Sequence, residues 1–233
     1  MKRFFWGILV GFFVLGLGNG AVFAAPTGIV ITGTSSIEKA PDQTTIVFTI
    51  WTKGETSEDA QSWNARVSSQ VYQSLLSEGI NRDSWKTTQM NLQPIYKNED
   101  TKPRIIGYQM THQVQVTLIG TEKAGRVVKV LAESGVQSIT SVRFGLKDPK
   151  GAQKEALALA AKDAKEKAEL VAQAAGTTIK NVRYMGEPQI GYQAYSEYAD
   201  VETFKNSTEE NPPVWAGSVV ITATVNMELN LVE

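Results

Sequence analysis

Few residues in the sequence have the types and spacing that chemistry requires. The single histidine, His112, lies between Met110 and Val114 on the apolar face of an expected strand. A catalytic triad needs a hydroxyl nucleophile and an acid beside the histidine, and a metal site needs further histidines or a carboxylate cluster. The pattern therefore favours a packed His112 over a catalytic base or a metal ligand.

The sequence also has no other recognisable catalytic motif. The absence of cysteine excludes disulfides, thiolate nucleophiles and cysteine-type metal sites. A glycine-rich stretch at 16–20 does not follow a strand, so it is no phosphate-binding loop, and no Walker, HExxH or GxSxG sequence occurs. Acidic residues fall on expected helix faces and in a loop, so paired carboxylates cannot be picked out. We assign no catalytic, cofactor-binding or metal-binding residues, and expect no cofactor and no enzymatic activity.

Composition narrows the class of protein. Of 233 residues, 42% are hydrophobic and 20% are charged, and 23 basic side chains oppose 24 acidic ones. This balance provides no strong field that would attract nucleic acid, and it disfavours disorder and a polytopic membrane protein. We expect an ordinary globular chain with no nucleic-acid partner.

Residues 1–24 have the pattern of a secretory signal peptide. Lys2 and Arg3 precede an apolar run at 4–17, and small residues at Val22 and Ala24 mark a cleavage site. An uncleaved single-span anchor is the alternative, but the apolar run is short for a bilayer. We expect cleavage after Ala24, a periplasmic or secreted protein, and a single domain at 25–233.

Three segments have helical periodicity and clear end signals. They are expected at 57–78, 122–134 and 149–175, and each ends at a glycine, namely Gly79, Gly135 and Gly176. The apolar stripes of the three segments comprise Ala60, Trp63, Val67, Val71 and Leu75; Ala124, Val127, Val128 and Leu131; and Ala156, Ala160, Ala164, Ala168, Val171 and Ala175.

Period-two alternation predicts strands between these helices, at about 45–51, 84–96, 105–119, 142–146 and 219–231. The second of these places Met90, Leu92 and Tyr96 on one face. Long strands with one apolar and one polar face predict an α+β fold, in which three helices cover one side of an antiparallel sheet. The order of elements in 43–119 and 136–231 suggests a βαββ pseudo-repeat.

The segment at about 188–213 interrupts this pattern. It contains Tyr192, Tyr195, Tyr198 and Phe204 among acidic residues, and loops of this length tend to be functional or disordered. Two interpretations stay open: the tyrosines contact a partner or neighbouring subunit, or the segment is a mobile surface hairpin.

Several segments together resemble SIMPL-domain proteins of the bacterial cell envelope. They are IVITGTSSIEKAPDQTTIVFTI near the start, GYQMTHQVQVTLIGTEKAGRVVKVLAESGVQSITSVRFGLKDP in the middle, and EALALAAKDAKEKAELVAQAAG and AGSVVITATVNMELNL near the end. The resemblance covers about residues 28–231. It implies an α+β fold, export, ring-like homo-oligomers and a loose link to envelope and oxidative stress. It provides no catalytic residues.

Two functional hypotheses follow. In the first, the protein is a non-enzymatic homo-oligomer of the envelope, whose subunits pair through sheet edges or the tyrosine-bearing loop. In the second, it is a monomeric or dimeric binding module that presents Gln109, Gln113 and Gln115 on a polar sheet face to a small ligand or cell-wall fragment.

Overall fold

A computed structural model describes residues 28–99, 102–194, 196–197 and 216–232. The elements, in chain order, are β1 (Gly28–Lys39), β2 (Gln43–Gly54), α1 (Ser57–Ser77), the short 3-10 helix η1 (Arg82–Ser84), β3 (Trp85–Glu99), β4 (Lys102–Ile119), α2 (Ala124–Glu133), β5 (Ser138–Gly145), α3 (Pro149–Ala174), β6 (Ile179–Met185), β7 (Gln189–Gln193), β8 (Ser196–Glu197) and β9 (Val219–Leu231). This confirms the α+β class, the antiparallel pairing and the three helices.

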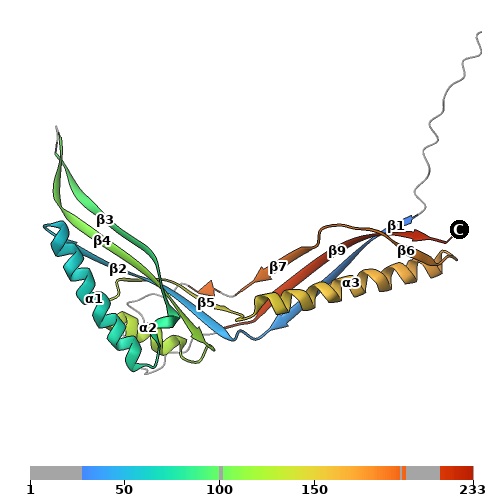
Figure 1. The fold of residues 1–233 in the computed structure, drawn as a ribbon, viewed down its shortest axis with the longest axis horizontal. Coiled ribbons are helices and arrows are strands. Elements are labelled where there is room, and N and C mark those ends of the chain that lie inside the picture. Colours follow the sequence, from blue (N-terminus) through green and yellow to red (C-terminus); the bar gives the residue numbers. More distant parts are fainter. Residues whose placement is uncertain (1–27, 100–101, 195, 198–215, 233) are drawn as a thin grey trace, which may run out of the picture.

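The strands form two sheets, where the sequence predicted one. One sheet has the order β3-β4-β2-β5-β8, and the other has the order β1-β9-β6, with β7 also paired to β9. Figure 1 shows two arms that meet at an angle: α1 and α2 lie against the first sheet, and α3 lies along the second. We call these arms the α1 half and the α3 half.

The α1 half is built around a core of large aliphatic and aromatic side chains. Ile46 and Phe48 of β2, Val116 of β4 and Phe144 of β5 are fully buried against Leu75 of α1 and its neighbours. Polar contacts add to this packing, because the buried Asn64 amide donates to the Ile50 carbonyl (3.2 Å) and Thr52 donates to the Ala60 carbonyl (2.7 Å). Helix α1 is thereby fixed across β2 and β4.

The α3 half has a different core, in which small residues line the helix. The buried residues of α3 occur at every fourth position: Ala152, Ala156, Ala160, Ala164, Ala168 and Ala172. They face Ile221, Leu229 and the other alternate residues of β9. The predicted stripe is confirmed as far as Ala168, but it continues to Ala172, and Val171 is 45% exposed.

The row of buried alanines on α3 allows the backbone of β1 to approach this helix closely. A Cβ atom placed on Gly33 would overlap the carbonyl oxygen of Ala160 and the methyl group of Ala164. The hydroxyl of Ser35 donates to the carbonyl of Ala156 (2.7 Å) one step further along β1. Gly33 and Ser35 are therefore small because the helix lies directly against them.

The helix ends agree with the sequence signals. Thr56 and Asp59 form a capping box at the start of α1, and Asp148 accepts from the Gly151 N–H (3.0 Å) at the start of α3. Gly79, Gly135 and Gly176 have φ values of 76°, 91° and 73°. After them the N–H groups of Ile80, Val136 and Thr177 donate back into the last helical turn.

The two halves exchange strands, which modifies the predicted pseudo-repeat. In the α1 half, α1 covers the arrangement β2-β4-β3, and in the α3 half, α3 covers the equivalent β1-β9-β6. The second repeat in the sequence begins with β5, but β5 pairs with β2 in the first sheet. Strand β1 takes the corresponding place beside β9. Each half therefore contains a strand from the other part of the chain.

The crossing point is held by Asp42, which lies between β1 and β2. Its N–H donates to the Gly145 carbonyl (3.0 Å), its carbonyl accepts from the Gly120 N–H (2.7 Å), and its carboxylate accepts from the Lys147 N–H (2.6 Å). The hydroxyl of Tyr192 on β7 accepts from the Leu146 N–H (3.1 Å) beside it. We call these contacts the Asp42 joint.

Several side-chain placements differ from the sequence prediction. Trp63 is 49% exposed, and Asn64 takes the buried position beside it. Met90, Leu92 and Tyr96 are 60%, 36% and 55% exposed, although their alternation predicted a buried face. Helix α1 lies over β2 and β4 and has few contacts with the edge strand β3, so Met90 and Leu92 lack helical cover although they pair with His112 and Met110 of β4. The tip of the β3–β4 hairpin also extends past α1 (Figure 1).

The predicted long loop at 188–213 contains regular structure at its start. Strand β7 pairs with β9, and β8 pairs with Val142 and Arg143 of β5. Residues 198–213 and Tyr195 lie outside the described residues, as do 1–24. The prediction of a signal peptide therefore stays a prediction, and both interpretations of the segment that carries Tyr195 and Tyr198 stay open.

Candidate functional site

A cleft in the α1 half brings together polar and aromatic side chains from four elements. It has a volume of about 390 Å³ and is lined by Ser68, Ser69 and Tyr72 of α1, Arg82 of η1, Trp85 and Thr87 of β3, and His112 and Val114 of β4. The floor is the helix-facing side of the sheet, where β3 begins to leave the cover of α1. We call this the His112 cleft.

Both ring nitrogens of His112 are within hydrogen-bonding distance of a hydroxyl. Ser68 Oγ lies 3.1 Å from Nδ1, and Thr87 Oγ1 lies 3.0 Å from Nε2. A neutral imidazole has one donor and one acceptor nitrogen, and hydroxyls can complement either tautomer. Partial burial lowers the pKa of His112, which favours this neutral form.

This geometry differs from that of a catalytic triad. In a triad, a carboxylate holds the second nitrogen of the histidine and stabilises the imidazolium. Here the hydroxyl of Thr87 occupies that place, and Ser68 lies 3.4 Å from Asn64 Oδ1 as well as contacting His112. The histidine lies on the predicted face of its strand, between Met110 and Val114, with its ring fixed by these two hydroxyl contacts.

Two further lining residues, Arg82 and Trp85, have hydrogen-bond donors without a partner among the described residues. The guanidinium of Arg82 makes no hydrogen bond or ion pair with any described residue, and Arg82 is the only charged residue that lines the cleft. Trp85 packs edge-to-face against Tyr72, with ring centroids 5.2 Å apart and planes at 76°. Its Nε1 is the one buried side-chain polar atom in the described ranges that has no hydrogen-bond partner.

A second candidate surface consists of exposed apolar side chains on the β3–β4 hairpin, outside the cover of α1. Its apolar side chains are between 36% and 60% exposed, and they are Met90, Leu92 and Tyr96 of β3 with Ile105 and Ile106 of β4. We call them the hairpin cluster. An apolar cluster on an edge strand is typical of a surface that contacts another protein.

The two outermost long strands differ in how their edges are protected. At β1, the backbone N–H of Thr34 donates to Asp163 of α3 (2.8 Å), and Lys167 lies 3.4 Å from the carbonyl of Thr32. At β3, no described strand pairs with the outer edge. Strand β1 is therefore partly blocked by the side chains of α3, whereas the outer edge of β3 is unpaired within the described part of the chain.

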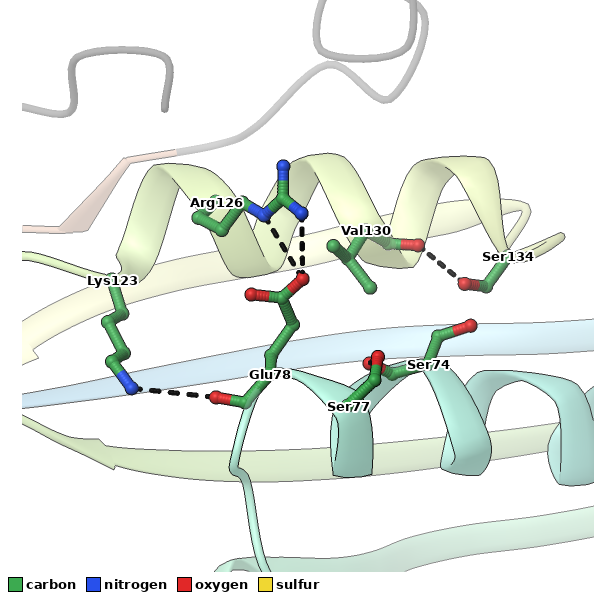
Figure 2. A network of polar contacts seen from close by, with 7 residues as sticks. All are labelled: Ser74, Ser77, Glu78, Lys123, Arg126, Val130 and Ser134. Carbon is green, nitrogen blue, oxygen red and sulfur yellow. Dashed lines mark hydrogen bonds and ion pairs between the residues drawn. The ribbon is translucent and has the colours of Figure 1, made fainter. Parts of the chain in front are cut away.

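A polar network fixes α2 at the end of α1 (Figure 2). The carboxylate of Glu78, immediately after α1, accepts from Nε (3.1 Å) and Nη2 (2.9 Å) of Arg126. The Lys123 ammonium lies 3.5 Å from the Glu78 carbonyl oxygen, and the hydroxyl of Ser134 donates to the Val130 carbonyl (2.6 Å). The Glu78 contacts join α2 to the end of α1, and the Ser134 bond lies within the end of α2, so we assign this network a structural role.

The polar sheet face of the second hypothesis lies on the opposite side of the first sheet from the cleft. Gln109, Gln113 and Gln115 are half-buried there. The side-chain oxygen of Gln113 accepts from the Thr88 hydroxyl (3.0 Å). Tyr192, predicted as a partner contact, uses its hydroxyl within the Asp42 joint. Sequence reasoning missed Arg82 and Trp85, because they belong to a short 3-10 turn and a strand start with no motif.

Two classes of feature do not occur in the described part of the chain. It contains no group of three or more His, Cys, Asp or Glu side chains that could hold a metal ion. None of its helices is long and apolar enough to cross a membrane.

Comparison with known proteins places this fold in a family. A family model called SIMPL, described as a protein of unknown function (DUF541), matches residues 29–229. The chain is 26% identical over 160 residues to the uncharacterized protein YggE of Edwardsiella ictaluri, covering 67% of each chain. It is 25% identical over 167 residues to the 26 kDa periplasmic immunogenic protein of Brucella melitensis, covering 70% of this chain and 67% of that protein. Because the family model spans most of its length, this chain belongs to the SIMPL family.

Proposed function

We propose that this protein is a non-enzymatic, self-assembling component of the cell envelope. The observation that carries the proposal is the hairpin cluster, which places exposed apolar side chains on and beside an unpaired edge strand. Soluble chains rarely leave such an edge uncovered, because it can pair with another chain. We infer that the edge is covered by a second copy of the same protein.

The shape of the molecule favours head-to-tail contact between copies. The hairpin lies at the end of the α1 half, and the α3 half carries exposed apolar residues on β6 and β7, including Val182, Tyr184 and Ile190. A contact between two different surfaces repeats from copy to copy, and it gives a ring when the rotation closes. Assembly through these surfaces is consistent with a ring-like homo-oligomer.

The proposed envelope location has separate support. Relatives in Brucella melitensis and Brucella abortus are named 26 kDa periplasmic immunogenic proteins. Residues 1–24 have the sequence pattern of an export signal. A role in envelope or oxidative stress, which the family resemblance implies, is part of the same proposal.

Charge reversal of the apolar surface tests the assembly proposal. We expect Tyr96→Lys combined with Ile106→Lys to reduce the native mass, because two ammonium groups would have to be buried in the contact. Both side chains are more than half exposed, so the subunit should fold normally. Light scattering on a sizing column measures the mass, and circular dichroism checks the fold.

A matched control uses exposed apolar residues far from the hairpin. Leu159 and Leu170 of α3 are 43% and 68% exposed, and changing both to Lys should leave the assembled mass unchanged. If the hairpin variant keeps the full mass, or if only the α3 variant dissociates, the hairpin cluster is not the contact surface.

A further inference from the structure

The His112 cleft has the composition of a small ligand site. Its volume of about 390 Å³ falls within the range typical of ligand pockets, which starts at roughly 300 Å³. Its lining combines the apolar surfaces of Tyr72, Trp85 and Val114 with hydroxyl groups from α1 and β3. A ligand would therefore meet both apolar and hydrogen-bonding groups.

The positive charge of the cleft favours an anionic ligand over a neutral or cationic one. Among the described residues, Arg82 supplies the single positive charge of the cleft, no carboxylate lines it, and the guanidinium has no partner. A planar guanidinium binds a carboxylate with two parallel hydrogen bonds. One guanidinium and no opposing acid suit a ligand with one negative charge.

The cleft also contains neutral hydrogen-bond donors. The hydroxyls of the exposed Ser69 and the half-buried Tyr72 make no hydrogen bond with other described residues, so both can donate to a ligand. Oxygen atoms of a ligand would accept from these hydroxyls. The hydroxyls of Ser68 and Thr87 contact His112 instead, and they hold its ring in place.

We propose that the His112 cleft binds a small organic monocarboxylate, with the carboxylate on Arg82 and an aromatic or aliphatic body against Tyr72, Trp85 and Val114. The site lies on the helix-facing side of the sheet, away from the polar face of Gln109, Gln113 and Gln115. It does not depend on self-assembly, because none of its lining residues belongs to the hairpin cluster.

Three probes with one aromatic body test the charge requirement. Phenylacetate is the anion, phenylacetamide its neutral analogue and phenethylamine a cation of similar size. Calorimetry and the ligand-induced rise in melting temperature measure their binding to the full chain. We expect phenylacetate to bind, and the amide and the amine to bind at least about tenfold more weakly, since a charge-assisted hydrogen bond is stronger than one between neutral groups.

Variants of two arginines locate the site. Arg82→Gln should lower the affinity for phenylacetate at least about tenfold by removal of the charged donor. Arg66→Gln removes an exposed arginine on α1 that does not line the cleft, and it should leave the affinity unchanged. Arg82 is exposed, so its variant should fold, which circular dichroism verifies.

The possible results are distinct. Selective binding of phenylacetate that requires Arg82 supports the proposal. Equal binding of all three probes, the same affinity in Arg82→Gln as in the wild type, or no detectable binding of phenylacetate overturns it. Repeating the titration on the Tyr96→Lys, Ile106→Lys variant separates this result from the assembly proposal, because loss of assembly should leave phenylacetate binding intact.

Discussion

His112 is the residue whose surroundings most directly determine its charge. Burial lowers its pKa, and the hydroxyls of Ser68 and Thr87 complement the neutral ring. The folded protein therefore favours the neutral form of His112, which acts as a hydrogen-bonding group.

This environment makes stability depend on pH. The unfolded chain has the ordinary histidine pKa of about 6.5, so below that pH it binds more protons than the folded protein. The free energy of unfolding should therefore be constant with respect to His112 above pH of about 6.5 and should fall as the pH drops through the lowered folded pKa. Thermal melting between pH of about 7 and 5 measures this loss.

A His112→Gln variant separates the histidine from other titrating groups. The amide can still hydrogen-bond to the two hydroxyls but does not titrate, so the loss of stability on acidification should become smaller. Carboxylates such as Asp163 titrate at lower pH, because Lys167 and the Thr34 N–H lower its pKa. An identical pH dependence in the variant and the wild type would show that His112 is not the group responsible.

At the scale of elements, the close contact between β1 and α3 organises the α3 half. Small residues face the helix at Gly33 and Ser35, and the helix presents alanines at every fourth position. Any added volume at this contact must separate the two elements, because the first atom a new Cβ would meet belongs to the helix backbone.

Gly33→Val should therefore lower the free energy of unfolding by about 1–3 kcal/mol, the usual effect of overpacking a core. Urea denaturation measures the change. Gly186→Ala is the control, since its added methyl would meet only ordinary contacts at 3.6 Å and beyond, and it should change stability little. Equal stability of Gly33→Val and the wild type would contradict the close contact.

The same contact explains what the sequence could predict. The helices were predictable because caps and glycine ends are local signals, such as Thr56, Asp148 and Gly176. Strand β1 lacked an obvious alternation because two of its inward residues, Gly33 and Ser35, are small for a tertiary reason. A helix that packs closely on a strand requires small residues on that face of the strand. The local sequence pattern does not reveal which helix will pack there.

Exposure and sheet membership also depend on distant parts of the chain. Alternation correctly placed Met90 and Leu92 on the helix-facing side of β3, but it could not show that α1 covers β2 and β4 and leaves the edge strand β3 largely uncovered. Alternation likewise could not show that β5 joins the first sheet and β1 the second. For the His112 cleft, the sequence predicted only which face of its strand His112 occupies. It could not predict Arg82 and Trp85, because tertiary packing brings them to the cleft.

At the scale of the whole molecule, two sheets share strands and meet at the Asp42 joint. Asp42 contacts Gly120, Gly145 and Lys147, and Tyr192 contacts Leu146 at the same place. These bonds connect segments that lie far apart in the sequence, so they define how the arms diverge. A defined angle between the arms is what a closed ring of copies requires, because the rotation from one copy to the next must repeat.

The most direct test of this account is the native mass of the purified protein at two concentrations, measured by light scattering on a sizing column. We expect a discrete particle of several copies whose mass is the same at both concentrations, because burial of the hairpin cluster should give a stable contact. A monomer at both concentrations would contradict the proposal that this protein assembles through its exposed edge.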